Sequence, residues 1–518
     1  MKRYKQANED IRLSDTLRGR VLAKKKPTAP RRAIALATAA VLLFTAAAAG
    51  AAFARRSEDI TTAPPLDTPA ETTAAPADTA TPTTTETFEG MLPLQLTEVA
   101  YPTMTQYPLQ YLGANGETLD GFSEAYSAWR EDKLARQNQP AGYDTGLDEA
   151  SAALMRQFLI STDKTAGQNR VISPLNLYLA LAMLTEATDT TSRAALLDLL
   201  GADSADTLRE RVASIWTANY VDDGESTTRL AASLWLADGL PYRADTLDRL
   251  AKHHYAASFR GVMGSDAMNT ALRDWLNANT GGLLTEQVSS LSFDPDTVLG
   301  LATTIYYQSK WDDEFQTSAT ADRTFHAAAG DLTVPFMSQR EWSTYLRGEG
   351  FGAVRKGLSQ GMMWLILPDE GVTTDDLLAG DSLYALIDTI DLNQWPSRTH
   401  TYVDIAMPKF DITADLTLNE GLSALGLDEL FSDRTADFSP ITDDAALADQ
   451  LYLSQVKHAA RVKVDEEGCE AAAYTMLMVT ATSARLGEPI DFILDRPFIF
   501  VITSDTGATL FAGVVEQP

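Results

Sequence analysis

The sequence predicts an α+β fold in which N-terminal helices pack on a large mixed central β-sheet. Apolar residues recur at helical spacing over 147–161, 175–188 and 268–279, whereas the region 301–515 holds short apolar runs of strand length. Helices first and strands later is an order typical of domains whose helices cover a mixed sheet. The composition, 45% hydrophobic and 22% charged, is that of a globular protein.

The helix expected over 175–188 has the clearest start signal. Ser173 is a residue of the N-capping type, and Pro174 stands in the first turn, where its missing N–H is not needed. The helix over 268–279 is followed by Gly281-Gly282, a stop signal. The expected strands cover residues 301–307, 362–367, 401–407, 451–456, 460–464, 498–503 and 509–515.

Residues 33–54 form a run without charge that, as a helix of about 33 Å, could span a bilayer core. The basic stretch before it should stay in the cytoplasm of a bacterial-type cell. Residues 1–32 are longer than the n-region of a normal signal peptide, which favours an uncleaved signal-anchor. The alternative is a secretory signal cleaved after Ala54, because Ala52-Phe53-Ala54 has the small residues of a cleavage site. Either interpretation predicts an extracellular location for the remaining chain.

Three further segments follow the apolar run. Residues 55–90 are rich in Thr, Ala and Pro, a composition that cannot bury a core, so we expect an extended stalk. Residues 91–146 contain more aromatic residues, Trp129 among them, and the sequence assigns this extension no role. The main domain is expected over residues 147–518.

Charge and cysteine content exclude several classes of function. The chain carries a net charge of −29, with +10 in residues 1–56 and therefore −39 in the rest, so nucleic acid is not expected as a partner. The single cysteine, Cys469, excludes an intramolecular disulfide. The five histidines show no metal-ligand spacing, and no metal or cofactor is expected.

Gly357-Leu358-Ser359-Gln360-Gly361 matches the G-x-S-x-G pattern of a hydrolase nucleophile. That motif requires a helix directly after the serine, whereas residues 362–367 read as a strand. A glycine-rich hairpin turn is therefore the favoured interpretation, and a hydrolase that uses Ser359 is the weakest of the functional hypotheses.

A series of motifs in residues 147–518 resembles, in order, the sequence of the serpin family. The motifs occupy residues 169–174, 305–311, 407–410, 422–427, 436–439, 464–475, 492–502 and 510–513. The resemblance implies a serpin fold, with further sheets besides the central one and an exposed reactive loop. It also implies an inhibitor, not an enzyme: a serine protease cleaves the loop and is trapped as an acyl-enzyme when the loop inserts into the central sheet. No cofactor is implied, and we expect a monomer.

The resemblance places the loop hinge at Glu466, Gly468, Cys469, Ala471, Ala472, Ala473 and Thr475. A strand that continues from Gly468 alternates faces with period two, which turns Cys469, Ala471, Ala473, Thr475, Leu477 and Val479 inward. These side chains are small or apolar and uncharged, while the bulky Tyr474 faces outward. This pattern favours an active inhibitor; the alternative is a non-inhibitory serpin that acts as an extracellular binding module.

Counting from Gly468 places the reactive bond at Thr482-Ser483, with Ala481 and Arg485 as rivals. A small residue at this bond suits elastase-like or subtilisin-like proteases, whereas Arg485 would suit a trypsin-like enzyme. The resemblance further implies a polar cluster that controls sheet opening, formed by Ser173, Asn176, Thr303 and His458 with the nearby Trp311. Asn176 and Thr303 both depart from the family pattern, and we hypothesise that they exchange hydrogen-bonding roles across one network. The alternative for His458 is a buried core histidine that has no role in sheet opening.

Overall fold

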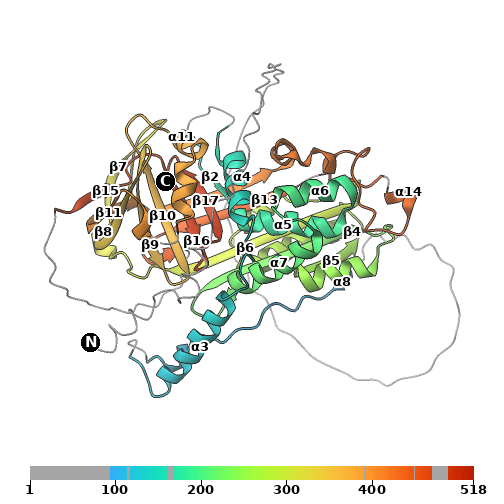
Figure 1. Cartoon of the computed structure of the whole chain (residues 1–518), viewed down its shortest axis with the longest axis horizontal. Helices are drawn as coiled ribbons and strands as arrows, with labels where there is room; N and C mark the ends of the chain where they lie inside the picture. The colour runs from blue at the N-terminus through green and yellow to red at the C-terminus, as the bar shows by residue number, and fades with distance from the viewer. Residues whose placement is uncertain are drawn as a thin grey trace, which may run out of the picture. The chain divides into compact units, whose positions relative to one another are not determined.

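Two large sheets and the helices around them organise the protein (Figure 1). The computed structural model describes residues 94–113, 117–161, 167–389, 392–448, 450–454, 456–469 and 488–518. The predictions for residues 1–93 and for most of the reactive loop, residues 470–487, lie outside the described residues.

Most of the helices lie in the first half of the described chain. They are α3 Phe122–Gln137, α4 Leu147–Leu159, α5 Pro174–Ala187, α6 Thr190–Leu199, α7 Ala205–Asn219, α8 Ala244–His253, α9 Asp266–Asn279, α10 Thr285–Val288, α11 Thr374–Ala379, α12 Ser382–Ile387, α13 Asn419–Leu422 and α14 Ala445–Ala448, with short helical turns η1 Leu109–Tyr111, η2 Thr317–Ala319, η3 Leu392–Gln394, η4 Ser423–Leu427 and η5 Asp428–Phe431.

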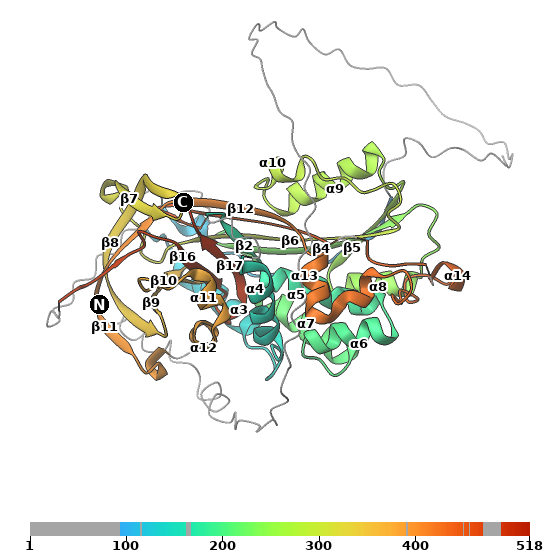
Figure 2. The ribbon, with the colours of Figure 1, turned by 90° about the horizontal axis from the view of Figure 1, so that it is seen from above.

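The first sheet has eight strands among the described residues. They are β1 Leu94–Thr97, β3 Val221–Asp222, β4 Thr227–Ala237, β5 Ala256–Gly261, β6 Leu299–Lys310, β12 Phe410–Thr417, β13 Lys457–Val464 and β14 Gly468–Cys469. Their order is β1-β5-β4-β6-β14-β13-β12, with β3 paired to β4. Figure 2 shows α9 and α10 on one face of this sheet and α5, α7 and α8 on the other.

The second sheet has nine strands in the described part of the chain. They are β2 Arg170–Ile172, β7 Ala321–Ala327, β8 Gly330–Gly348, β9 Phe351–Leu358, β10 Gly361–Pro368, β11 Arg398–Pro408, β15 Ile490–Ile493, β16 Phe498–Thr503 and β17 Thr509–Val515. Their order is β15-β11-β8-β9-β10-β16-β17-β2, with β7 paired to β8. β15, which follows the reactive loop in sequence, pairs in parallel with β11.

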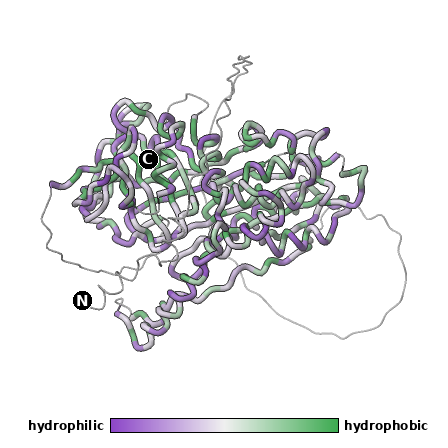
Figure 3. Tube along the Cα trace, viewed as in Figure 1, coloured by the Kyte–Doolittle hydropathy of each residue, from purple (hydrophilic) through white to green (hydrophobic). Residues whose placement is uncertain are grey.

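Helix α5 lies in the core and packs against strands of both sheets, β6 and β17. Almost all of its residues are buried, which agrees with the rule that a helix apolar on every side belongs in an interior. Ser173 caps it by accepting a hydrogen bond from Asn176 N, and Pro174 occupies the first helical position, as predicted. Figure 3 shows the hydrophobic residues gathered where helices and sheets meet.

One predicted strand is wrong. Residues 451–454 and 456 are not in a strand, although Leu451 and Leu453 alternate with exposed neighbours. The amide of Leu453 bonds to the carbonyl of Leu430 in η5, so the backbone here pairs with a helical turn and not with a sheet. The predicted strands over 498–503 and 509–515, in contrast, are confirmed residue for residue.

The extension that the sequence left unexplained packs on the main body. β1 adds an edge strand to the first sheet by pairing with β5, and α3 packs against α7 (Figure 1). Tyr101 stacks on Tyr220 with ring centroids 5.4 Å apart. The extension therefore contributes both to a sheet and to the apolar core.

Among the described residues, no helix has the length and apolar character needed to cross a membrane. This finding contradicts the predicted localisation, an extracellular domain anchored by one N-terminal span, and we do not retain it. The run 33–54 on which the prediction rested lies outside the described residues.

Candidate functional site

The candidate site is the hinge that leads into the reactive loop. Gly468 and Cys469 form a two-residue strand, β14, that pairs antiparallel with β6 on one side and with β13 on the other. Cys469 lies opposite Ser309 and Val464 and is 3% exposed. A Cβ atom on Gly468 would lie 2.3 Å from the carbonyl oxygen of Ser309, so no side chain fits at this position.

Glu466 fixes the chain just before the hinge. Its carboxylate forms an ion pair with Lys409 at 2.8 Å and accepts a hydrogen bond from Thr320 Oγ1 at 2.8 Å. Its backbone carbonyl accepts a bond from Phe315 N at 3.0 Å. Burial acts to raise the pKa of Glu466, but the hydrogen bonds from Lys409 and Thr320 outweigh it and hold the pKa below its usual value.

Trp311 lies under the same turn. It is buried, its Nε1 donates to the carbonyl of Asp465 at 3.0 Å, and its backbone N donates to the carbonyl of Glu467 at 3.0 Å. The Nζ of Lys356 lies 5.5 Å from the centroid of the Trp311 ring. Trp311 therefore supports the hinge.

The structure brings together two residues of the predicted polar cluster, Ser173 and His458. The ring nitrogen Nε2 of His458 accepts a hydrogen bond from Ser173 N at 3.1 Å, and Ser173 Oγ donates to the carbonyl of Leu510 at 2.6 Å. His458 is buried, and this burial lowers its pKa to about 4. The imidazole is therefore neutral at pH 7 and acts as an acceptor that joins β13 to the start of α5.

Two members of the predicted cluster behave otherwise than expected. The side-chain nitrogen Nδ2 of Asn176 is buried without a hydrogen-bond partner, so this amide donates no hydrogen bond to Thr303. Trp311 stands eight residues beyond Thr303 along β6, which is about 26 Å of strand, and belongs with the hinge instead of the Ser173 cluster.

Sequence reasoning missed the partners of Glu466. Lys409 lies in one of the quoted motifs, but nothing local in the sequence pairs it with a residue 57 positions away. The turn around Ser359 was predicted: Ser359 and Gln360 connect β9 to β10, and Gly361 has the left-handed φ of +101°. Ser359 Oγ bonds to the hydroxyls of Ser309 and Ser226 and not to a histidine, so it has no catalytic partner.

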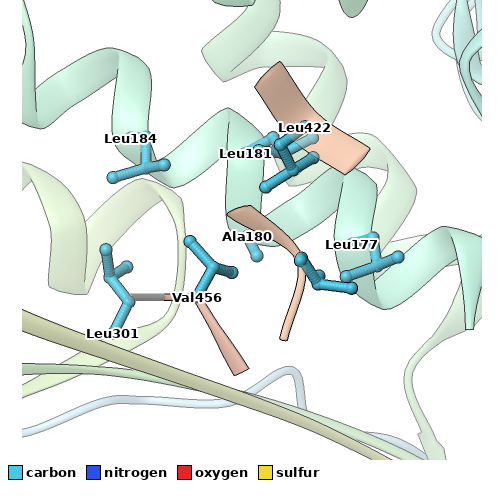
Figure 4. Close-up of a pocket in the computed structure, with 8 residues that line it drawn as sticks. Leu177, Ala180, Leu181, Leu184, Leu301, Leu422 and Val456 are labelled. Atoms are coloured by element: carbon cyan, nitrogen blue, oxygen red, sulfur yellow. The ribbon is translucent and has the colours of Figure 1, made fainter. Parts of the chain in front are cut away.

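A small cavity of about 20 Å³ lies where β6 and the residue before β13 approach α5 (Figure 4). Its lining is entirely apolar and consists of Leu177, Ala180, Leu181, Leu184, Leu301, Leu418, Leu422 and Val456. Figure 4 shows Leu301 and Val456 facing the leucines of α5 across this space.

Comparison with known proteins agrees with this architecture. The family model described as "Serpin (serine protease inhibitor)" matches residues 148–518. The chain belongs to the serpin family. Serpins are inhibitors of serine proteases and not enzymes, as the sequence predicted.

Similar serpins occur in plants. Serpin-Z1C of Triticum aestivum is 29% identical over 372 residues, which cover 69% of this chain and 92% of the relative. The native structure of tengpin, a thermophilic serpin, has a TM-score of 0.64 and 25% identity and covers 74% of this chain and 95% of tengpin. Arabidopsis AtSerpin1 in its native stressed conformation has a TM-score of 0.63 and 24% identity, covering 74% of this chain and 99% of its own. These comparisons lend no support to the bacterial-type origin expected from the N-terminal sequence.

Replacing Lys409 with methionine is expected to destabilise the serpin by about 1 kcal/mol at pH 7, because the partly buried Glu466 carboxylate loses its counter-ion. Since the pKa of Glu466 is lowered by folding, this contribution is present above the unfolded value of about 4.3 and is lost as the pH falls below it. The difference in denaturant midpoint between wild type and K409M should therefore shrink towards pH 3.

Lys463→Met is the matched control for K409M, since Lys463 stands 3.6 Å from Asp465 and is more exposed than Lys409. Equal losses of stability in both variants would contradict this role of Lys409.

Proposed function

We propose that this serpin inhibits serine proteases irreversibly, by inserting its cleaved reactive loop between β6 and β13. Residues 147–518 form the inhibitory domain in this proposal, and residues 91–146 form an extension to it. The observation that carries the proposal is the position of β14, whose two residues already lie between these strands.

Within the described residues, β6 and β13 pair with β14 and not with each other. A strand that continued from Cys469 would extend the pairing of β14 along both of these neighbours. β14 is antiparallel to both of its neighbours, which is the direction that an inserting loop would continue.

The observed register can be extended from Cys469 into the loop. Each second residue would then face one residue of β6 and one of the β13 segment: Ala471 would face Tyr307 and Val462, Ala473 would face Ile305 and Ala460, Thr475 would face Thr303 and His458, and Leu477 would face Leu301 and Val456. These positions are the inward set predicted from the sequence.

Two of these positions would meet side chains of matching polarity. Leu477 would arrive between Leu301 and Val456, two of the eight residues that line the apolar cavity in front of α5 (Figure 4). Thr475 would bring a hydroxyl beside Thr303 and the imidazole of His458, whose Nε2 already accepts a bond from Ser173. The seam would therefore give the leucine apolar neighbours and the threonine polar ones.

The hydrogen bonds that insertion would form are sufficient, in order of magnitude, to drive it. About ten new ladder hydrogen bonds at roughly 1 kcal/mol each would favour the inserted state by about 10 kcal/mol.

The reactive bond is proposed at Thr482-Ser483, with Ala481 and Arg485 as rivals. A small residue at this bond favours an elastase-like or subtilisin-like target, and Arg485 a trypsin-like one. The alternative function is a non-inhibitory serpin that binds partners without trapping them.

Incubation of the full chain with elastase, subtilisin and trypsin, followed by a denaturing gel, separates these functions. An inhibitor gives a protease–serpin band that survives denaturation, and the mass of the released C-terminal peptide identifies the cleaved bond. Complete cleavage by all three enzymes without such a band would favour the non-inhibitory alternative.

A further inference from the structure

Helix α3 of the extension contacts the main body through two chains of hydrogen bonds and ion pairs, called arms below. The first arm starts at Trp129, whose Nε1 donates to Asp223 Oδ2 at 2.9 Å in a buried position. The other oxygen of Asp223 accepts bonds from Glu225 N and Ser226 N at 3.0 and 2.9 Å. Ser226 Oγ then lies 3.0 Å from Ser359 Oγ. This arm connects the extension to the turn between β9 and β10.

The second arm reaches the same turn from another direction. Lys133 Nζ forms an ion pair with Asp505 Oδ2 at 2.8 Å, and Gln137 donates to the same oxygen at 3.0 Å. Asp505 Oδ1 accepts a bond from Gly361 N at 2.9 Å. Lys133 Nζ also lies 3.4 Å from the carbonyl oxygen of Ser359. Both arms therefore converge on residues 359–361, the second half of the segment that matches the G-x-S-x-G pattern.

This turn holds the end of β6. Ser359 Oγ lies 3.0 Å from Ser309 Oγ and 3.3 Å from Lys310 N, and Ser359 N donates to the carbonyl of Lys310 at 2.8 Å. Gln360 N donates to Ser309 Oγ at 2.9 Å. Ser309 and Lys310 are the two residues of β6 that pair with Cys469 and Gly468. The network thus runs from the extension to the strand partners of the hinge.

We propose that α3 and the Ser359 turn position the end of β6 and so restrain the opening of the hinge at Cys469. The two arms fasten the β4–β6 side of the first sheet to turns of the second sheet. Separation of β6 from β14 then requires strain in, or loss of, these contacts. Trp129, Lys133 and Ser359 are positioning residues in this proposal, which rests on the proposed function only for its consequence, the readiness of the loop to insert.

The test uses Cys469, the single cysteine of the chain, as a probe of hinge opening. Because Cys469 is buried, a thiol reagent labels it only when β14 opens or the protein unfolds. Labelling of the full chain by excess 5,5′-dithiobis(2-nitrobenzoate) should be about tenfold faster in the W129F/K133A double variant, which corresponds to about 1.4 kcal/mol. Ser359→Ala, which removes the hydroxyl to which the first arm leads, should give a similar increase.

Two controls separate hinge opening from general destabilisation. Glu131→Ala changes an exposed residue of the same helix and should leave the labelling rate unchanged. Leu383→Ala opens a cavity in α12, outside the network, and shows how much labelling accompanies an ordinary loss of stability. A rate in W129F/K133A no higher than that in either control would overturn the proposal. If wild type forms no complex with proteases, the proposed function fails. The labelling comparison still tests whether α3 and the Ser359 turn restrain the hinge.

Discussion

Replacing Ala473 with glutamate is expected to convert this serpin from an inhibitor into a substrate. In the extended register, residue 473 faces inward between Ile305 and Ala460, where a carboxylate would be removed from water without a partner. That cost of several kcal/mol per charge would slow insertion, so the acyl-enzyme hydrolyses before the protease is trapped. The fraction of protease encounters that end in a gel-stable complex should fall at least about tenfold.

Ala472→Glu provides the matched control. Residue 472 would face outward beside Arg461, a neighbour of opposite charge, so the same substitution should leave complex formation near wild type. The assay is titration of a fixed amount of protease with each variant, read on a denaturing gel. Loss of complex in both variants would contradict the register, and retention in both would contradict insertion.

Acidification is expected to destabilise the protein through His458 by about 3 kcal/mol between pH 6.5 and 4. Burial lowers the pKa of this histidine to about 4, whereas in the unfolded chain it is about 6.5. Between these values the unfolded state binds the proton and the folded state does not, so this contribution to stability is present above pH 6.5 and is lost as the pH falls. Protonation would also remove the acceptor for Ser173 N.

The measurement is the free energy of unfolding in denaturant at several pH values, for wild type and His458→Gln. The variant should be less stable at pH 7, but the difference between the two proteins should shrink towards pH 4, because glutamine does not titrate. His400→Asn, at an exposed histidine, serves as control and should follow the wild-type curve. A difference between wild type and H458Q that does not change with pH would contradict the neutral, buried state of His458.

Local signals in the sequence predicted the elements that depend on local structure. Strands β16 and β17 are continuous apolar runs with a short polar turn between them, and both are buried along their whole length. The start of α5 follows from its serine cap and proline. The alternation at Leu451 and Leu453 misled the prediction, because a pattern of period two records which residues are buried and not what covers them.

Contacts between distant segments could not be predicted from one sequence. Lys409 lies between β11 and β12 and Glu466 between β13 and β14, and the bond from Trp129 to Asp223 joins residues 94 positions apart. The aromatic content of residues 91–146 indicated some packing, but only the fold shows where α3 binds. The family resemblance grouped Trp311 with His458, and the length of β6 separates them.

The thermal stability of the chain before and after cleavage tests the central proposal, loop insertion, most directly. A protease that cuts within residues 481–486 without being trapped would release the loop and permit it to enter the seam between β6 and β13. With about 10 kcal/mol gained on insertion, the unfolding temperature of the cleaved protein should rise by on the order of 20 °C. An unfolding temperature that stays the same or falls after cleavage would contradict insertion, and with it the mechanism proposed for this serpin.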